Sequence, residues 1–126
     1  MNPVLVAGAI LGFLSVALGA SAEHILQSRV DAEVWRWVMT AVRYHQVGAL
    51  VVTALGLSLA AGARPERWLA MSGWFLIAGT ILFSFSIYAA ALTGIRELTY
   101  VTPLGGVSLM FGWLVLIWAG IRASKD

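Results

Sequence analysis

The stretch WLAMSGWFLIAGTILFSFSIYAAALTGI, residues 68–95, contains no charged side chain and is flanked by Arg67 and Arg96. A helix needs about 20 apolar residues to cross a hydrocarbon core of roughly 30 Å, so this stretch is long enough to span a membrane. A charge at the bilayer centre costs roughly 2.5–3.5 kcal/mol on insertion scales, and both arginines lie outside the stretch. Residues 68–95 therefore predict a transmembrane helix.

Three further uncharged windows occupy residues 4–22, 44–63 and 98–121, and charged residues border each of them. Of the 126 residues, 60% are hydrophobic and 11% are charged, whereas a typical soluble domain has about 25% charged residues. The connections between windows are too short for crossovers, which favours antiparallel neighbours. We predict an all-α fold: one transmembrane domain over residues 1–126, an integral membrane four-helix bundle with up-down-up-down order.

Residues 31–43 are predicted to be an extramembrane start of the second helix, with Asp31 as its N-cap. Ala20-Ser21-Ala22 is similar to a signal-peptidase site. However, no basic segment precedes the first window, and that window is longer than most signal-peptide cores. We therefore interpret the first window as a retained span.

Four spans place equal numbers of basic side chains on the two sides of the membrane. Arg64, Arg67, Arg122 and Lys125 lie on the side of the termini, and Arg29, Arg36, Arg43 and Arg96 lie on the other. The positive-inside count is therefore a tie. Acidic residues neutralise the second group, and on that ground we expect both termini in the cytoplasm.

The composition excludes several classes of function. Cysteine is absent, which removes disulfides, thiolate nucleophiles and cysteine metal sites. No basic run is present, so we expect no nucleic-acid partner. The sequence holds no nucleophile–base pair, phosphate-binding loop or HExxH motif. We predict that the chain is not an enzyme and has no catalytic residues, metal ligands or cofactor.

Small residues recur at helical spacing along the spans, and such stripes let transmembrane helices approach closely. The glycines that we expect at helix contacts are Gly8, Gly12 and Gly19 in the first span, Gly79 in the third, and Gly105 and Gly112 in the fourth.

The two histidines could mark a polar site. His45 shares a helix face with Ala41 and Val52, so it should face the bundle. The predicted pocket, at one membrane interface, is formed by Glu23, His24, His45 and Thr102. We expect the first helix to unwind after Gly19, which would place the two imidazoles within about 10 Å, close enough for a direct or water-bridged contact. In the alternative, each histidine only bonds a local backbone group or Glu23.

Several segments resemble a known family. Ala17-Leu18-Gly19-Ala20, His24-Ile25-Leu26 and Val101-Thr102-Pro103-Leu104-Gly105-Gly106-Val107 are similar to the YgdD/YwdK-like inner-membrane proteins, known as domain of unknown function 423. The resemblance covers nearly the whole chain in order, and the Thr-Pro-x-Gly-Gly segment is its most specific part. It implies a four-span protein of the bacterial inner membrane with no assigned reaction. Members often carry a histidine at the position of Gly48 and tend to have glycine at Phe85.

Two functions of different classes are compatible with these observations. The first is a non-enzymatic accessory or scaffolding protein that contacts membrane lipid, a larger membrane complex or a second copy of itself. The second is the binding of a small ligand, such as haem, a metal, a quinone or a lipid headgroup, between His24 and His45. A carrier of small solutes is disfavoured, because no charge lies at mid-bilayer.

Overall fold

The computed structural model describes residues 1–123, and the prediction of an all-α membrane protein is confirmed. Four helical segments are long and apolar enough to cross a membrane: Pro3–Leu26, Ala32–Ala60, Glu66–Thr93 and Arg96–Ala123. The first segment consists of α1 (Pro3–Ser21) and the π-helix η1 (Ala22–Leu26), and the second is α2 (Ala32–Ala60). The third consists of α3 (Glu66–Thr80), the π-helix η2 (Ile81–Phe85) and α4 (Ser86–Thr93). The fourth consists of the 3₁₀-helix η3 (Arg96–Val101) and α5 (Thr102–Ala123). The described residues contain no strand.

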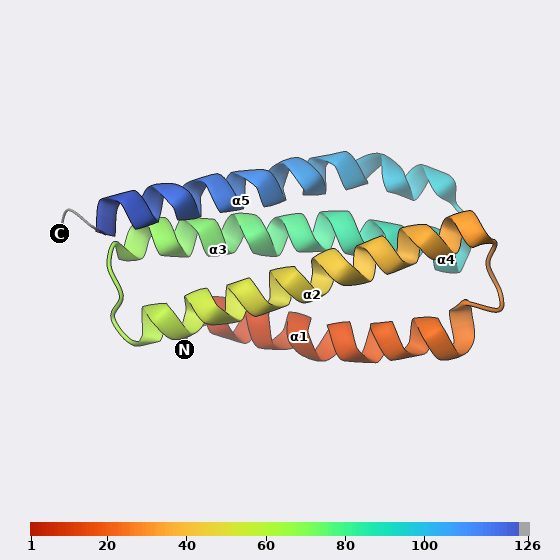
Figure 1. The fold of residues 1–126 in the computed structure, drawn as a ribbon, viewed down its shortest axis with the longest axis horizontal. Coiled ribbons are helices and arrows are strands. Elements are labelled where there is room, and N and C mark those ends of the chain that lie inside the picture. Colours follow the sequence, from red (N-terminus) through yellow and green to blue (C-terminus); the bar gives the residue numbers. More distant parts are fainter. Residues whose placement is uncertain (124–126) are drawn as a thin grey trace.

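Successive segments run in opposite directions, and the start of α1 and the end of α5 lie at the same end of the bundle (Figure 1). The most extensive contacts join α1 to α2 and α3 to α5, and α2 also packs on α3. In Figure 1 α1 and α5 form the two outer edges of the bundle. Their outer faces are therefore left for lipid or for other proteins.

Local side chains fix where the helices begin and end. Asp31 caps α2, as predicted: its Oδ1 accepts a hydrogen bond of 2.9 Å from the Val34 N–H. Asn2 caps α1 in the same way, and its side-chain amide also donates to the Gly56 carbonyl at 2.8 Å. Asn2 therefore ties the start of α1 to the end of α2. Gly94, with φ of 73°, ends α4 in the left-handed conformation that glycine adopts most easily.

Close contacts between α1 and α2 show which residues lie at the same depth. A Cβ built on Gly8 would touch Thr53, and one built on Gly19 would touch Val42. Because the two helices are antiparallel, the midpoint of the uncharged window 4–22 lies level with Gly48. We use this level as the middle of the bundle.

Most, but not all, of the glycines predicted at helix contacts lie against a neighbouring helix. A Cβ on Gly79 would lie 2.7 Å from the Leu109 backbone nitrogen, far below normal contact distance. Gly8, Gly105 and Gly112 are similarly close to neighbouring helices, whereas Gly19 would make an ordinary contact. For Gly12 the prediction is wrong, since a Cβ there would meet nothing within 4 Å. Four residues turn an α-helix by about 400°, which leaves Gly12 roughly 40° away from the direction of Gly8.

Reporter fusions test the topology. Fusions after Ala63 and at the C-terminus are expected to report one compartment, and fusions near Asp31 and Arg96 the other, because four spans alternate in direction. A topology reporter such as alkaline phosphatase provides the measurement. Opposite results for Ala63 and the C-terminus would contradict a four-span chain. Lys125, which contributes to the charge count on the terminal side, lies outside the described residues.

Candidate functional site

His45 is the most enclosed titratable side chain of the bundle, with an exposed fraction of 0%. Its Nε2 lies 2.8 Å from the Leu11 carbonyl oxygen, and its Nδ1 lies 3.0 Å from the Tyr88 hydroxyl. A carbonyl only accepts, so Nε2–H is the donor in the first bond. In the neutral ring Nδ1 then accepts from the Tyr88 hydroxyl. The two partners thus select one tautomer and leave neither ring nitrogen free.

These bonds join three helices, because His45 belongs to α2, Leu11 to α1 and Tyr88 to α4. The Phe85 ring closes the site: its centroid lies 5.2 Å from that of His45 and 5.5 Å from that of Tyr88. The Phe85 and Tyr88 rings are nearly perpendicular, an arrangement that aromatic pairs favour. The histidine is therefore held by packing as well as by hydrogen bonds.

Two hydroxyl side chains continue this arrangement along the third span. Ser84 donates a hydrogen bond of 2.7 Å to the Ala41 carbonyl of α2. Thr80 is completely buried, and its hydroxyl finds no hydrogen-bond partner among the described residues. The π-helix η2 lies between Thr80 and α4, and π-helical turns are frequent at functional sites. We call His45, Thr80, Ser84 and Tyr88 the polar seam.

The polar seam lies deep in the bundle. Thr80 touches Gly48, which marks the middle level, and His45 precedes Gly48 by about three residues, or roughly 5 Å along the axis. His45 therefore lies near the middle level of the bundle, whereas the sequence predicted a place at the membrane interface. Arg43, which suggested that place, is exposed on the outer side of α2. A long arginine side chain can extend from there toward water, so it does not mark the depth of the opposite face.

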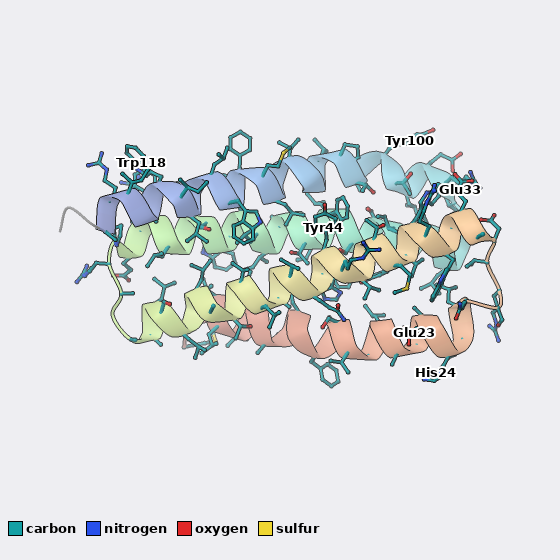
Figure 2. The ribbon with its side chains drawn as sticks, viewed as in Figure 1. Glu23, His24, Glu33, Tyr44, Tyr100 and Trp118 are labelled. Atoms are coloured by element: carbon teal, nitrogen blue, oxygen red, sulfur yellow. The ribbon has the colours of Figure 1, made fainter. Side chains whose placement is uncertain are left out.

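The structure does not bring Glu23, His24, His45 and Thr102 together. Figure 2 shows His24 on the side of the first segment that faces away from α2, and Glu23 beside it is exposed. The helix does not unwind after Gly19, because its hydrogen bonds continue to Ser21 and then through η1. His24 is thus turned outward and exposed. The predicted joint pocket of the two histidines is not formed.

Thr102 makes a different contact from the one predicted. Its hydroxyl lies 2.6 Å from that of Ser86, which also donates to the Phe83 carbonyl at 2.9 Å. This pair joins the start of α5 to the start of α4. Thr102 therefore contributes to helix packing rather than to a histidine site.

Tyr88 connects the polar seam to a cavity of about 300 Å³. The cavity lies between the end of the first segment, where Ala22 and Ile25 line it, and α4, where Leu92 does. The Tyr88 ring forms part of its wall, while the Tyr88 hydroxyl bonds His45. The cavity is thus the route by which a molecule could approach the seam.

The described residues hold no group of three histidine, aspartate or glutamate side chains that could bind a metal ion. His45 would have to give up a hydrogen bond before it could ligate haem or a metal. In this geometry the polar seam joins helices through buried hydrogen bonds.

Sequence reasoning did not identify Thr80, Ser84 or Tyr88 as site residues. The signal was present, because these three residues follow one another at intervals of four and therefore lie along one side of the helix. Gly48 and Phe85 both border the seam: Gly48 touches Thr80, and Phe85 packs on His45.

Comparison with known proteins identifies relatives along the whole chain. The chain is 38% identical over 122 residues to the UPF0382 inner membrane protein YgdD of Escherichia coli K12, covering 97% of this chain and 92% of that protein. It is 34% identical over 124 residues to a UPF0382 membrane protein of Haemophilus influenzae, with 98% of each chain covered. A Staphylococcus epidermidis UPF0382 membrane protein is 34% identical over 125 residues, with 97% and 98% covered.

No solved structure matches the chain. Residues 18–106 match the family described as "Protein of unknown function (DUF423)", a segment that includes all four residues of the polar seam. The chain is therefore a multi-pass protein of the bacterial inner membrane and belongs to the DUF423 family.

Proposed function

We propose that this protein is a non-enzymatic accessory component that docks on a larger membrane assembly. The observation that carries the proposal is the use of buried and half-buried polar side chains to join helices. These bonds run from His45 to Leu11 and Tyr88, from Ser84 to Ala41, from Ser72 to Gly112, from Ser108 to Phe75, and between Ser86 and Thr102. Groups committed in this way support a structural role for the interior, and they leave recognition to the outer surface.

A groove between α2 and α5 is the part of that surface best shaped for a partner. It has a volume of about 270 Å³. Its lining includes Tyr44, Val47, Gly48, Gly106, Met110 and Trp113. Gly106 leaves room at the bottom, since a Cβ there would meet only the Phe83 ring at 3.8 Å, and the larger side chains form the sides. An apolar helix can lie in such a groove with close backbone contact.

The depth of Trp113 supports a protein partner over lipid alone. Gly79 of α3 contacts Leu109 of α5, so the middle level passes close to Leu109. Trp113 is then about four residues, or roughly 6 Å, from the middle, well inside a hydrocarbon half-thickness of about 15 Å. Lipid-facing tryptophans favour the membrane interfaces instead. Trp113 is 43% exposed, and buried tryptophans are common in the centres of protein interfaces.

Photo-crosslinking in intact membranes tests this proposal. A photoreactive residue at Val47, in the groove, is expected to give a discrete protein adduct. The matched control is Val6 on the outer face of α1, which has a similar exposed fraction (44% against 48%) but does not line the groove. Only lipid adducts are expected from Val6. Lipid adducts alone from Val47, or the same protein adduct from both positions, would overturn the proposal.

The alternative ligand site between His24 and His45 finds no support in the geometry. His24 is exposed and His45 is enclosed near the middle of the bundle. The two rings therefore do not face a common space that one haem, metal ion or headgroup would occupy.

A further inference from the structure

Two cavities meet at the end of the bundle where α1 is connected to α2. The first is the apolar cavity of about 300 Å³ that Tyr88 lines. The second, of about 280 Å³, is lined by more polar residues, among them Trp37 and Arg96. Arg29, Val30 and Ala91 line both. The two cavities are therefore adjacent, one apolar and one more polar, with Arg29 at their junction.

Arg29 is free to bind an anion. Its side chain makes no hydrogen bond or ion pair within residues 1–123, where the one ion pair joins Arg64 to Glu66 at the opposite end. Arg96 is also without an acidic partner there, and its guanidinium stacks 5.3 Å from the centroid of the Trp37 ring. Arg96 lies directly after the uncharged window 68–95, and Arg29 lies in the connection that follows the first window, so both are beyond the apolar spans at the same end of the bundle.

The acidic side chains near the two arginines do not neutralise them directly. Asp31, which lines the polar cavity, is engaged in capping α2 through the Val34 N–H. Glu23, Glu33 and Glu97 lie at the same end of the bundle, but all are exposed and none is within ion-pair distance of either arginine. An anion in the polar cavity would therefore meet the guanidinium groups of Arg29 and Arg96, neither of which forms an ion pair within residues 1–123.

We propose that this double cavity binds an anionic phospholipid, with one acyl chain in the apolar cavity and the phosphate beside Arg29 and Arg96. A guanidinium can hold phosphate oxygens through two parallel hydrogen bonds. Basic pockets between transmembrane helices are known to hold anionic headgroups, and the cavity volume lies at the lower end of the range of about 300–1,000 Å³ for ligand sites. The second acyl chain remains in the bilayer. This inference is independent of the α2–α5 groove.

The bound acyl chain would lie against the Tyr88 ring and fill the space between the first segment and α4. Tyr88 holds His45, and His45 holds Leu11 of α1. Occupation of the cavity therefore stabilises the same three helices that the polar seam joins. The lipid should raise the thermal unfolding midpoint of the protein, since it binds the folded state.

The test measures this midpoint in detergent while dioleoyl-phosphatidylglycerol or dioleoyl-phosphatidylcholine is added. The acyl chains are the same, and only the first lipid has a net negative charge. The midpoint should rise with the anionic lipid and change little with the zwitterionic lipid or with inorganic phosphate alone. Equal rises with both lipids, or an equal rise with phosphate alone, would overturn the proposal.

Variants separate the site from general attraction of anions. Arg29→Gln is expected to weaken the apparent affinity for the anionic lipid at least about tenfold, which corresponds to about 1.4 kcal/mol, because it removes a charge-assisted hydrogen bond to the phosphate. The matched control is Arg36→Gln, an exposed arginine at the same end that lines neither cavity. Arg36→Gln should retain the wild-type affinity.

A variant with a large side chain in the apolar cavity provides a second test of the site. Ser21 is exposed and lines the apolar cavity, so Ser21→Phe should block the acyl chain while the lipid-free midpoint stays near the wild-type value. Equal losses in Arg29→Gln and Arg36→Gln, or full lipid stabilisation of Ser21→Phe, would contradict the site. Failure of this test leaves the crosslinking result for the α2–α5 groove unaffected.

Discussion

Gly8→Ala is expected to lower the free energy of unfolding by about 2–3 kcal/mol, a typical cost of forcing extra volume into a packed contact. A Cβ at Gly8 would lie 2.6 Å from the backbone nitrogen and the hydroxyl oxygen of Thr53. Backbone atoms cannot turn aside as a flexible side chain can, so α1 and α2 would have to separate. Their close approach supplies the van der Waals contact that holds helices together where no hydrophobic effect acts between them.

The matched control is Gly12→Ala, one helical turn further along α1. A Cβ at Gly12 would meet nothing within 4 Å, and alanine is the better helix former by about 1 kcal/mol. Gly12→Ala should therefore be neutral or slightly stabilising. Circular dichroism of the detergent-solubilised variants during heating gives the comparison. Equal destabilisation by both substitutions would show that the helix is rotated relative to the arrangement described.

The difference between these two glycines shows what the sequence could predict about packing. The GxxxG spacing identified a small-residue stripe on the first span, but spacing alone does not say which member the neighbouring helix touches. The answer depends on the rotation of α1 about its axis. The contacts of Gly8 with Thr53 and of Gly19 with Val42 show what that rotation is. The four spans were easier to predict, because bilayer thickness and the cost of buried charge constrain every span in the same way.

The burial of His45 could be predicted from the sequence, but its hydrogen-bond partners could not. The helix face shared with Ala41 and Val52 indicated that His45 would be buried, and it is. Its partners, Leu11 and Tyr88, are 34 and 43 residues away in the chain. Only the antiparallel register of three helices brings them together, and one sequence does not contain that register.

His24 was misplaced because the end of the first helix was predicted to unwind. The continuation through η1 keeps its backbone hydrogen bonds inside the helix. In a membrane an unpaired backbone group costs several kcal/mol, which favours such a continuation over an open turn. The consequence is a histidine on the outer surface, where Figure 2 shows it.

His45→Leu is expected to destabilise the protein by about 1–3 kcal/mol, because it leaves the Tyr88 hydroxyl inside the bundle without its acceptor. Tyr88→Phe should cost less, about 1 kcal/mol, since interhelical hydrogen bonds in membranes average roughly 0.6 kcal/mol and reach about 1.7 kcal/mol. Thermal or denaturant unfolding in detergent measures both. Tyr100→Phe is the matched control, because Tyr100 is 77% exposed and labelled at the edge of the bundle in Figure 2. It should be neutral.

The double variant separates the hydrogen bond from the packing of the two rings. In the His45→Leu background the Tyr88 hydroxyl is already without a partner, so Tyr88→Phe removes an unpaired group. The second substitution should then cost nothing or should restore stability. A coupling free energy of about 1–2 kcal/mol between the positions is the expected result, as is usual for residues in direct contact. Strictly additive effects would mean that the bond does not contribute to stability. In that case packing among His45, Phe85 and Tyr88 would be what joins α2 to η2 and α4 near the middle level of the bundle.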